Sequence, residues 1–177
     1  MNLLFLSDMK HDYMLSFLLE RGKVDWTNEK LSLEKVAQYD WIISYGYRHI
    51  INQQIIDASK NPIINLHISY LPFNRGAHPN YWSFKEKTPK GVSIHFIDKG
   101  IDTGPVLIQK ECTFNKMDTF ITSYSKLKSE IEELFYQFFD KIINKEITPK
   151  PQISQGTFHK KSDLPAGIDW NTNINDI

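Results

Sequence analysis

The sequence predicts an α/β protein with one open, mostly parallel sheet and helices flanking it. Three continuous apolar runs, which are typical of strands buried on both faces, occupy residues 2–7, 40–45 and 63–66. Segments with helical spacing of apolar residues separate these runs. Strands that alternate with helices usually pair in parallel, so we expect the runs to be strands of one sheet. A chain of 177 residues, 41% of them hydrophobic, can bury one sizeable core.

The first half of the chain predicts three helices and a short strand around these runs. The first helix ends at Arg21–Gly22 and places four side chains on its apolar side: Tyr13, Met14, Phe17 and Leu18. Residues 23–26 can form a short strand, and residues 31–39 have helical spacing. Residues 49–59 predict a third helix, which Asn61–Pro62 ends. Its inward face is formed by four isoleucines: Ile50, Ile51, Ile55 and Ile56.

The second half begins with a break in this pattern. Residues 68–79 contain prolines and a glycine and predict a loop, followed by a short helix over residues 78–84. The side chains of residues 90–98 alternate between two faces, as in a strand, and residues 105–114 predict a further strand close behind. We therefore expect a hairpin-like pair, which makes the sheet mixed.

The longest helical pattern covers residues 117–143. Its apolar stripe steps by three or four residues and is expected to pack on the sheet: Phe120, Tyr124, Leu127, Ile131, Leu134, Phe138 and Ile142. After Lys145 the sequence becomes polar and irregular. We therefore predict a main domain over residues 1–144 and a tail over residues 145–177 that packs on it or on a partner subunit. The long helix and the tail are compatible with a homodimer.

Composition excludes several classes of protein. The 21 basic and 21 acidic residues give no net charge, whereas a nucleic-acid-binding surface is basic, so we expect no nucleic-acid partner. No apolar run is long enough to span a membrane, and the start of the chain does not resemble a signal peptide. The single Cys112 excludes an internal disulfide and fits a reducing compartment. These features predict a cytoplasmic protein.

Three polar side chains follow predicted strands and are candidates for one site. Asn65 and His67 are two residues apart, so both point to the same side of an extended segment. Asp102 follows the strand over residues 90–98. An imidazole can move protons near neutral pH, an amide can donate to a developing oxyanion, and a carboxylate can stabilise a charged imidazole. Together they suit attack of an amine on a carbonyl-level carbon.

Structural roles stay open for each of these residues. An Asn-x-His pair can simply hold a loop, and Asp102 can be a turn residue before Gly104. Asp102-Thr103-Gly104 also matches the aspartic-protease loop, but that chemistry needs two carboxylates sharing a proton, and no second copy occurs. The aromatic residues between positions 73 and 84 can line a pocket or form core.

The chain offers no familiar metal or phosphate-loop motif. Five side chains could ligate a metal: His67, His78, His95, Asp98 and Cys112. Their spacing is not typical of a zinc site, so we expect no bound metal. Neither glycine-rich phosphate-binding motif is present. The basic stretch over residues 159–161 is either a solvated face or a contact to a phosphate.

Several separated pieces together resemble the signature of formyltransferases that use 10-formyltetrahydrofolate. In order, the pieces are Asn65–Pro72, Arg75–Gly76, His95–Phe96 and Ile101–Pro105. That family includes glycinamide ribonucleotide formyltransferase, methionyl-tRNA formyltransferase and the sugar N-formyltransferases. The form of residues 70–84 and of residues 156–164 is most similar to the sugar enzymes. The resemblance implies a Rossmann-like fold, here with an N-terminal half shorter than usual, since only about 64 residues precede Asn65.

The resemblance also implies roles for individual residues. Asn65 would stabilise the oxyanion of the formyl carbon, His67 would act as general base or charged donor, and Asp102 would hold His67 and help relay the proton. His95 would support these three from behind. The Leu71–Pro72 bond would be cis.

The resemblance further places the ligands. Tyr47, Arg48, His49 and Ile50 would form the backbone stretch that receives the pterin. The loop from Asp98 to Asp102 would lie opposite, with Asp98 and Ile101 contacting the cofactor. Three residues in the segment most similar to the sugar enzymes are expected to contact the substrate: Arg75, Gly76 and Trp82.

The resemblance thus implies transfer of a formyl group from 10-formyltetrahydrofolate to the amino group of a nucleotide-linked amino sugar, through a tetrahedral intermediate and without a metal. Residues 7–10 replace the glycine-rich turn of the purine enzyme, which counts against glycinamide ribonucleotide. The neutral charge and the lack of a further barrel after residue 177 count against tRNA. A formyltetrahydrofolate hydrolase and a catalytically silent folate- or nucleotide-binding module remain as alternatives.

Overall fold

A six-stranded mixed sheet lies at the centre of the computed structural model, which describes all 177 residues. The strand order is β2-β1-β3-β4-β6-β7. The strands are β1 (Asn2–Leu6), β2 (Lys23–Thr27), β3 (Trp41–Tyr45), β4 (Ile64–His67), β6 (Gly91–Phe96) and β7 (Val106–Glu111). The pairs among β1 to β4 are parallel, whereas β6 pairs antiparallel with both β4 and β7. The predicted mixed sheet with a hairpin-like pair is therefore confirmed.

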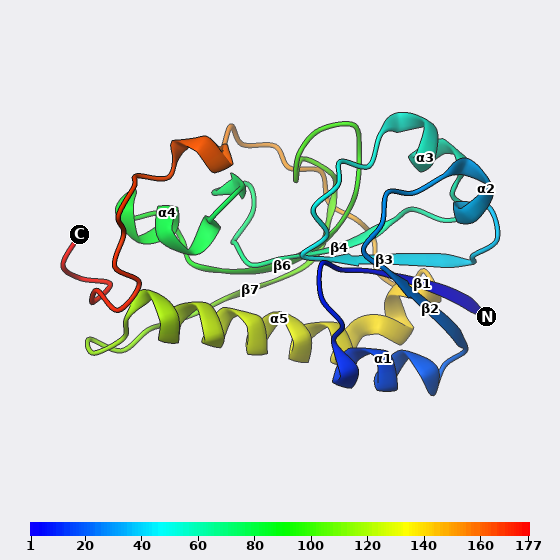
Figure 1. Cartoon of the computed structure of the whole chain (residues 1–177), viewed down its shortest axis with the longest axis horizontal. Coiled ribbons are helices and arrows are strands. Elements are labelled where there is room, and N and C mark those ends of the chain that lie inside the picture. Colours follow the sequence, from blue (N-terminus) through cyan, green and yellow to red (C-terminus); the bar gives the residue numbers. More distant parts are fainter.

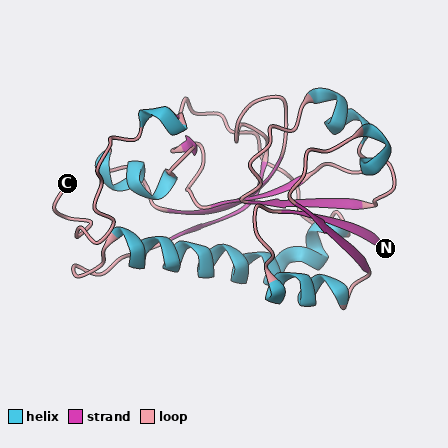
Figure 2. Cartoon of the chain, viewed as in Figure 1, coloured by secondary structure: helices cyan, strands magenta, loops and turns pink.

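Helices cover both faces of this sheet (Figure 1). The helices α1 (Asp12–Leu19) and α5 (Phe120–Ile143) lie on one face. The short helices α2 (Leu33–Val36) and α3 (Gln53–Ala58) lie on the other face, and α4 (Pro79–Lys85) lies beyond the sheet on that same side. Figure 2 shows that most of the tail after α5 is loop.

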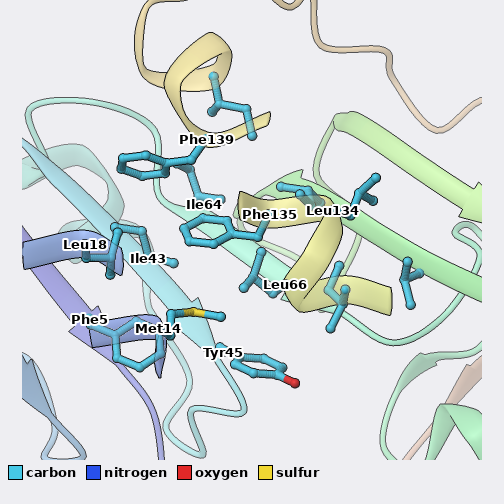
Figure 3. Packing of buried hydrophobic residues seen from close by; sticks show 14 of the residues in the cluster. Phe5, Met14, Leu18, Ile43, Tyr45, Ile64, Leu66, Leu134, Phe135 and Phe139 are labelled. Carbon is cyan, nitrogen blue, oxygen red and sulfur yellow. The ribbon is translucent and has the colours of Figure 1, made fainter. Parts of the chain in front are cut away.

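The alternation of side chains along each strand divides the interior into two clusters. Ile64 and Leu66 of β4 join a cluster of 20 buried residues that includes the inner faces of α1 and α5 (Figure 3). Ile63 joins a smaller cluster of seven on the opposite face, with residues of α2 and α3. Asn65 and His67 alternate with Ile64 and Leu66 along β4 and point to the face opposite α5. The larger core therefore packs on one face of β4, and the other face of this strand carries the polar side chains.

The apolar stripe of α5 is broader than predicted. Phe135 and Phe139 are fully buried, although neither belongs to the predicted stripe. Tyr124, expected inside, is 47% exposed, and Phe138 is only partly buried. The sheet and α1 together enclose more of the helix than a narrow stripe would cover.

Two inward assignments in the first half are wrong, those of Ile50 and Tyr13. Ile50 is 79% exposed because α3 begins only at Gln53, where the side chain of Asn52 accepts a hydrogen bond from the Ile55 N–H as a cap. Tyr13 is 89% exposed, and α1 buries Leu15 in its place.

The tail crosses the loop between β4 and α4. The two-residue strands β5 (Arg75–Gly76) and β8 (Phe158–His159) pair in parallel, and a single turn of 3-10 helix follows at Lys161–Asp163. Gly76 has a φ of 85°, and a Cβ there would meet the carbonyl oxygen of His159, so only glycine fits this crossing. Further on, Asn173 bridges to Thr119 at the start of α5. No helix has both the length and the apolar character needed to cross a membrane.

Candidate active site

The side chains of Asn65, His67 and Asp102 meet on the sheet face opposite α5. The amide nitrogen of Asn65 donates to Oδ1 of Asp102 at 3.3 Å, and Nδ1 of His67 lies 3.7 Å from Oδ2 of the same carboxylate. Asn65 and His67 come from β4, whereas Asp102 comes from the loop between β6 and β7. That loop therefore folds back over β4 and brings the carboxylate to the two strand residues.

The backbone around His67 decides which ring nitrogen can accept a proton. Nε2 lies 3.1 Å from the carbonyl oxygen of Asn74, and because a carbonyl only accepts, Nε2 carries the hydrogen. The neutral ring then has its lone pair on Nδ1, which faces Asp102. A proton added at Nδ1 would form an imidazolium directly beside the carboxylate. The ring is only 8% exposed, so little water competes for that position.

His95 lies behind the three side chains and is 1% exposed. Its Nδ1 donates to the carbonyl oxygen of Phe96 at 2.8 Å, which leaves Nε2 as the acceptor for the Asn65 amide at 3.0 Å. Nε2 also lies 3.5 Å from Oδ1 of Asp102. His95 therefore orients the Asn65 amide so that its nitrogen faces the carboxylate.

Asp102 is fixed by backbone and tail contacts. Its Oδ2 accepts a hydrogen bond from the Gly76 N–H at 2.8 Å, and its carbonyl oxygen accepts one from the Gln152 amide at 2.9 Å. Burial opposes its ionisation, but the Gly76 N–H and the two nearby imidazoles, which would attract the anion whenever either is protonated, together outweigh it. The pKa of the Asp102 carboxyl therefore lies well below its usual range, and the group is anionic at neutral pH.

These residues form part of the wall of a cavity of about 700 Å³. The carboxyl ends of β1, β3 and β4 contribute to it, as do the 97–102 loop and residues 158–161 of the tail. Five basic side chains line it: Arg48, Lys99, Lys128, Lys160 and Lys161. Only Asp8 and Asp102 are acidic, and Asp8 forms an ion pair with Arg48 at 2.6 Å. The lining has an excess of positive charge and suits an anionic ligand.

Most residues predicted for ligand contact line this cavity. Six of them do so: Tyr47, Arg48, His49, Ile50, Gly76 and Ile101. The hydroxyl of Tyr47 donates to the carbonyl oxygen of Glu29 at 2.6 Å, so this stretch is held against the loop after β2. The exposed Ile50 noted above is thereby explained, because its side chain faces the cavity and not the core.

Three predicted residues do not line the cavity: Asp98, Arg75 and Trp82. Asp98 accepts hydrogen bonds from the Gly100 N–H and the Thr103 hydroxyl, so it shapes the loop that carries Asp102. The guanidinium of Arg75 binds the side-chain oxygen of Gln152 and the carbonyl oxygen of Gln155.

Trp82 stacks on His159, with ring centroids 4.0 Å apart and planes at 7°. Like Arg75, it is therefore engaged by the tail. Both side chains contact the part of the chain that leads into the wall formed by residues 158–161. Their contact with a substrate stays a prediction.

The cavity also contains residues that sequence reasoning missed. Asp8 and His11 follow β1, while Tyr124 and Lys128 come from α5. Burial and the charge of Lys128 lower the pKa of His11. The apolar spacing of α5 gave no signal for Lys128, since a lysine outside the stripe is usually solvated. The basic stretch at 159–161 was the only available hint of this side of the wall.

A comparison of the sequence with known protein families gives one match. A formyl transferase family model matches residues 21–138. The chain belongs to the formyl transferase family. Because that match contains Asn65, His67 and Asp102, the candidate active site lies within the formyl transferase region.

Curated members of the formyl transferase family differ in their acceptors. A methionyl-tRNA formyltransferase of Thermodesulfovibrio yellowstonii is 37% identical over 140 residues, or 78% of this chain and 46% of the relative. A dTDP-4-amino-4,6-dideoxyglucose formyltransferase of Mycobacterium tuberculosis is 30% identical over 131 residues, or 74% of this chain and 55% of the relative. The chain thus spans about half the length of the curated relatives it matches.

A solved formyltransferase structure matches almost the whole chain. The formyltransferase PseJ from Anoxybacillus kamchatkensis, in complex with UDP-4,6-dideoxy-4-formamido-L-AltNAc and tetrahydrofolate, has a TM-score of 0.91 and 40% identity. The match covers 98% of this chain and 96% of PseJ. The formyltransferase, Rossmann-like fold is therefore confirmed. The Leu71–Pro72 bond is cis, as the resemblance implied. No group of three or more His, Cys, Asp or Glu side chains is arranged to hold a metal ion.

Proposed function

We propose that this protein transfers a formyl group from 10-formyltetrahydrofolate to the amino group of a nucleotide-linked amino sugar. The observation that carries the proposal is the cluster of Asn65, His67 and Asp102 in the wall of a large, positively charged cavity. An amide, an imidazole with a free acceptor nitrogen and a buried carboxylate are the groups that such a transfer needs.

The choice of acceptor is supported by the likeness to PseJ and by the charge of the cavity. PseJ was solved with a formylated UDP-sugar and tetrahydrofolate, and the match extends over nearly all of both chains. A nucleotide-linked sugar carries a diphosphate, and a folate carries a glutamate tail with ionised carboxylates, so both ligands are anionic. The four lysines of the cavity lining can meet both negative charges.

His67 and Asp102 are proposed to move the proton. In the transfer, the acceptor nitrogen bonds to the formyl carbon, the bond from that carbon to N10 of the donor breaks, and one proton passes from the amine to N10. Nδ1 of His67 is the ring nitrogen free to take this proton. Asp102 remains anionic and lies 3.7 Å away, so it stabilises the imidazolium until the proton is passed on.

Asn65 is proposed to stabilise the negative oxygen of the tetrahedral intermediate. One hydrogen of its amide is engaged by His95 at 3.0 Å, and the other makes a longer bond of 3.3 Å to Asp102. The longer bond is the weaker one, so a developing oxyanion can draw this hydrogen towards itself. An imidazolium at His67 would add a second donor.

The lining of the cavity is proposed to take two ligands. The pterin would lie against residues 47–50 and the loop from 99 to 101. The acceptor would lie against Lys160 and Lys161 of the tail and Tyr124 and Lys128 of α5. His67 and Asn65 would then contact both donor and acceptor.

The test is incubation with 10-formyltetrahydrofolate and a panel of UDP- and dTDP-linked amino sugars. Loss of donor matched by an equal amount of N-formyl sugar, measured by mass spectrometry, is the expected result. Donor loss with free formate and no formylated sugar would instead identify a hydrolase. Folate binding without any turnover would identify a silent module. Methionyl-tRNA is included as an acceptor because a 37% identical relative carries that name.

A further inference from the structure

A second pocket of about 310 Å³ adjoins the main cavity. The two share Ile68, Pro79 and Tyr124 in their walls, so a ligand can extend from one into the other. The remaining wall of the second pocket is mainly aromatic and apolar: His78, Asn80, Tyr81, Phe120, Ile121, Ser125 and Trp170. None of these seven residues lines the main cavity.

The aromatic rings of this pocket pack against one another. Trp170 stacks with His78, with centroids 6.3 Å apart and planes at 25°. Its ring plane is nearly perpendicular to those of Tyr81 and Phe120, at 80° and 84°. Trp170 is still 38% exposed and Ile121 48% exposed, so the chain leaves much of this apolar surface uncovered.

The pocket is short of charged groups but retains a few polar ones. The Asn80 amide is used internally, because it donates to the carbonyl oxygen of Phe120 and to Ser123. The hydroxyl of Ser125, by contrast, makes no hydrogen bond within the chain. The site therefore fits an uncharged, planar group whose edge can accept or donate hydrogen bonds.

Positive charge lies where the two pockets join. The Lys128 ammonium is 5.9 Å from the ring centre of Tyr124, which lines both pockets. Lys161 lies near enough to His78 to add to the effect of burial in lowering the pKa of that imidazole. Lys128 and Lys161 also line the main cavity. Both lysines are therefore close to residues of the aromatic pocket and also line the cavity that contains Asn65 and His67.

We infer that the aromatic pocket holds the nucleobase of the acceptor, with Lys128 and Lys161 at its diphosphate. This inference rests on the proposed function and adds to it the place where the nucleotide binds. A nucleotide-linked amino sugar has parts that match these features, namely a flat uncharged base, a diphosphate and then the sugar with its amine. The base stacks on Trp170, and the amine reaches His67 in the main cavity.

The test compares UDP with inorganic pyrophosphate, which lacks the base. Trp170→Ala should weaken UDP binding about 5- to 100-fold, the usual range for loss of a base–aromatic stack, measured by calorimetry. Pyrophosphate and tetrahydrofolate should bind as before. Trp170→Phe should keep most of the UDP affinity. Trp26→Phe, in the distant strand β2, is the matched control and should change none of the three.

Ser125→Trp provides a second variant, because it fills the pocket from an exposed position on α5 and leaves Trp170 in place. It should also abolish or strongly weaken UDP binding. Unchanged UDP affinity in both variants would overturn the inference, as would equal losses for UDP and pyrophosphate. A change in oligomeric state without a change in UDP affinity would assign the pocket to self-association and overturn it as well.

Formyl transfer by the wild-type protein is measured separately. If the wild type formylates a nucleotide-linked amino sugar but the UDP affinity is unchanged in the Trp170 and Ser125 variants, the inference fails and the proposed function stands. If UDP binding depends on Trp170 but no formyl transfer occurs, the pocket stands and the proposed reaction fails. Absence of any UDP binding would overturn both the pocket and the nucleotide-linked acceptor.

Discussion

Replacing Asp102 by asparagine tests whether its charge acts on His67. The substitution keeps the size of the side chain and an oxygen for the Gly76 N–H, which now donates to it at 2.8 Å. It removes the negative charge 3.7 Å from Nδ1 of His67. At an effective dielectric constant of about 20, two unit charges at that separation attract by about 4 kcal/mol.

Only part of this attraction is lost in the transition state, because the proton is then only partly on His67. A loss of about 3 kcal/mol lowers kcat about 100-fold, since each 1.4 kcal/mol or so is a factor of ten. The KM values for donor and acceptor should change by no more than about threefold, because the charge acts mainly on the imidazolium.

The assay follows N-formyl product at saturating donor, with folding checked by thermal unfolding. Asp40→Asn is the matched control, because the Asp40 carboxylate also accepts a backbone N–H at 2.8 Å but does not line the cavity. The control should retain wild-type turnover. A folded Asp102→Asn protein that turns over within about threefold of wild type would refute the proton path through His67.

Three further predictions concern stability and reactivity. Because folding lowers the pKa of Asp102, its negative charge stabilises the fold at pH values above the pKa of the unfolded state, and this contribution is lost as the pH falls towards the pKa of the folded state. In urea titrations, the difference in the free energy of unfolding between wild type and Asp102→Asn should become smaller below about pH 4. A difference that grows there would contradict the assignment. Phe135→Ala should lower the free energy of unfolding by about 3–5 kcal/mol in urea titrations, because Phe135 is fully buried in the larger core; a loss below about 1 kcal/mol would mean that the core there is loose. Burial raises the pKa of Cys112 to about 11, so at pH 8 iodoacetamide should modify it at least about 100-fold more slowly in the native protein than in urea, as followed by mass spectrometry. Equal rates would show that the thiol is exposed.

Much of the sheet could be predicted because its strands are buried on both faces or alternate cleanly. The run over 63–66 predicted β4, and its two-residue period predicted that Asn65 and His67 share one face. The alternation over 90–98 likewise predicted β6 and its partner. Such signals are local, so a single sequence is enough to see them.

The helix starts were harder because two signals competed. Ile50 and Ile51 extend the apolar spacing of α3 towards its start, yet Asn52 caps the helix two residues later. The cap wins because it satisfies a backbone N–H that would otherwise lack a partner. The preceding residues were thereby freed to line the cavity, a role that periodicity cannot reveal.

The contacts of the tail could not be predicted at all. β5 and β8 are two residues long and more than 80 residues apart in the chain, so they carry no periodic pattern. Arg75 and Trp82 were expected to contact a ligand because of the segment in which they occur. Within the chain their partners are Gln152 and His159, which only folding brings near.

β4 carries core and site on alternate residues, which limits how this gene can vary. Ile64 and Leu66 belong to the larger core, while Asn65 and His67 belong to the site. Insertion or deletion of one codon within β4 would exchange the two sets, placing isoleucine and leucine in the cavity and the amide and imidazole in the core. Stability and catalysis would fail together. Variation in acceptor choice is therefore expected to arise in the flanking loops and the tail, where a change of length does not alter which residues of β4 face the core and which face the cavity.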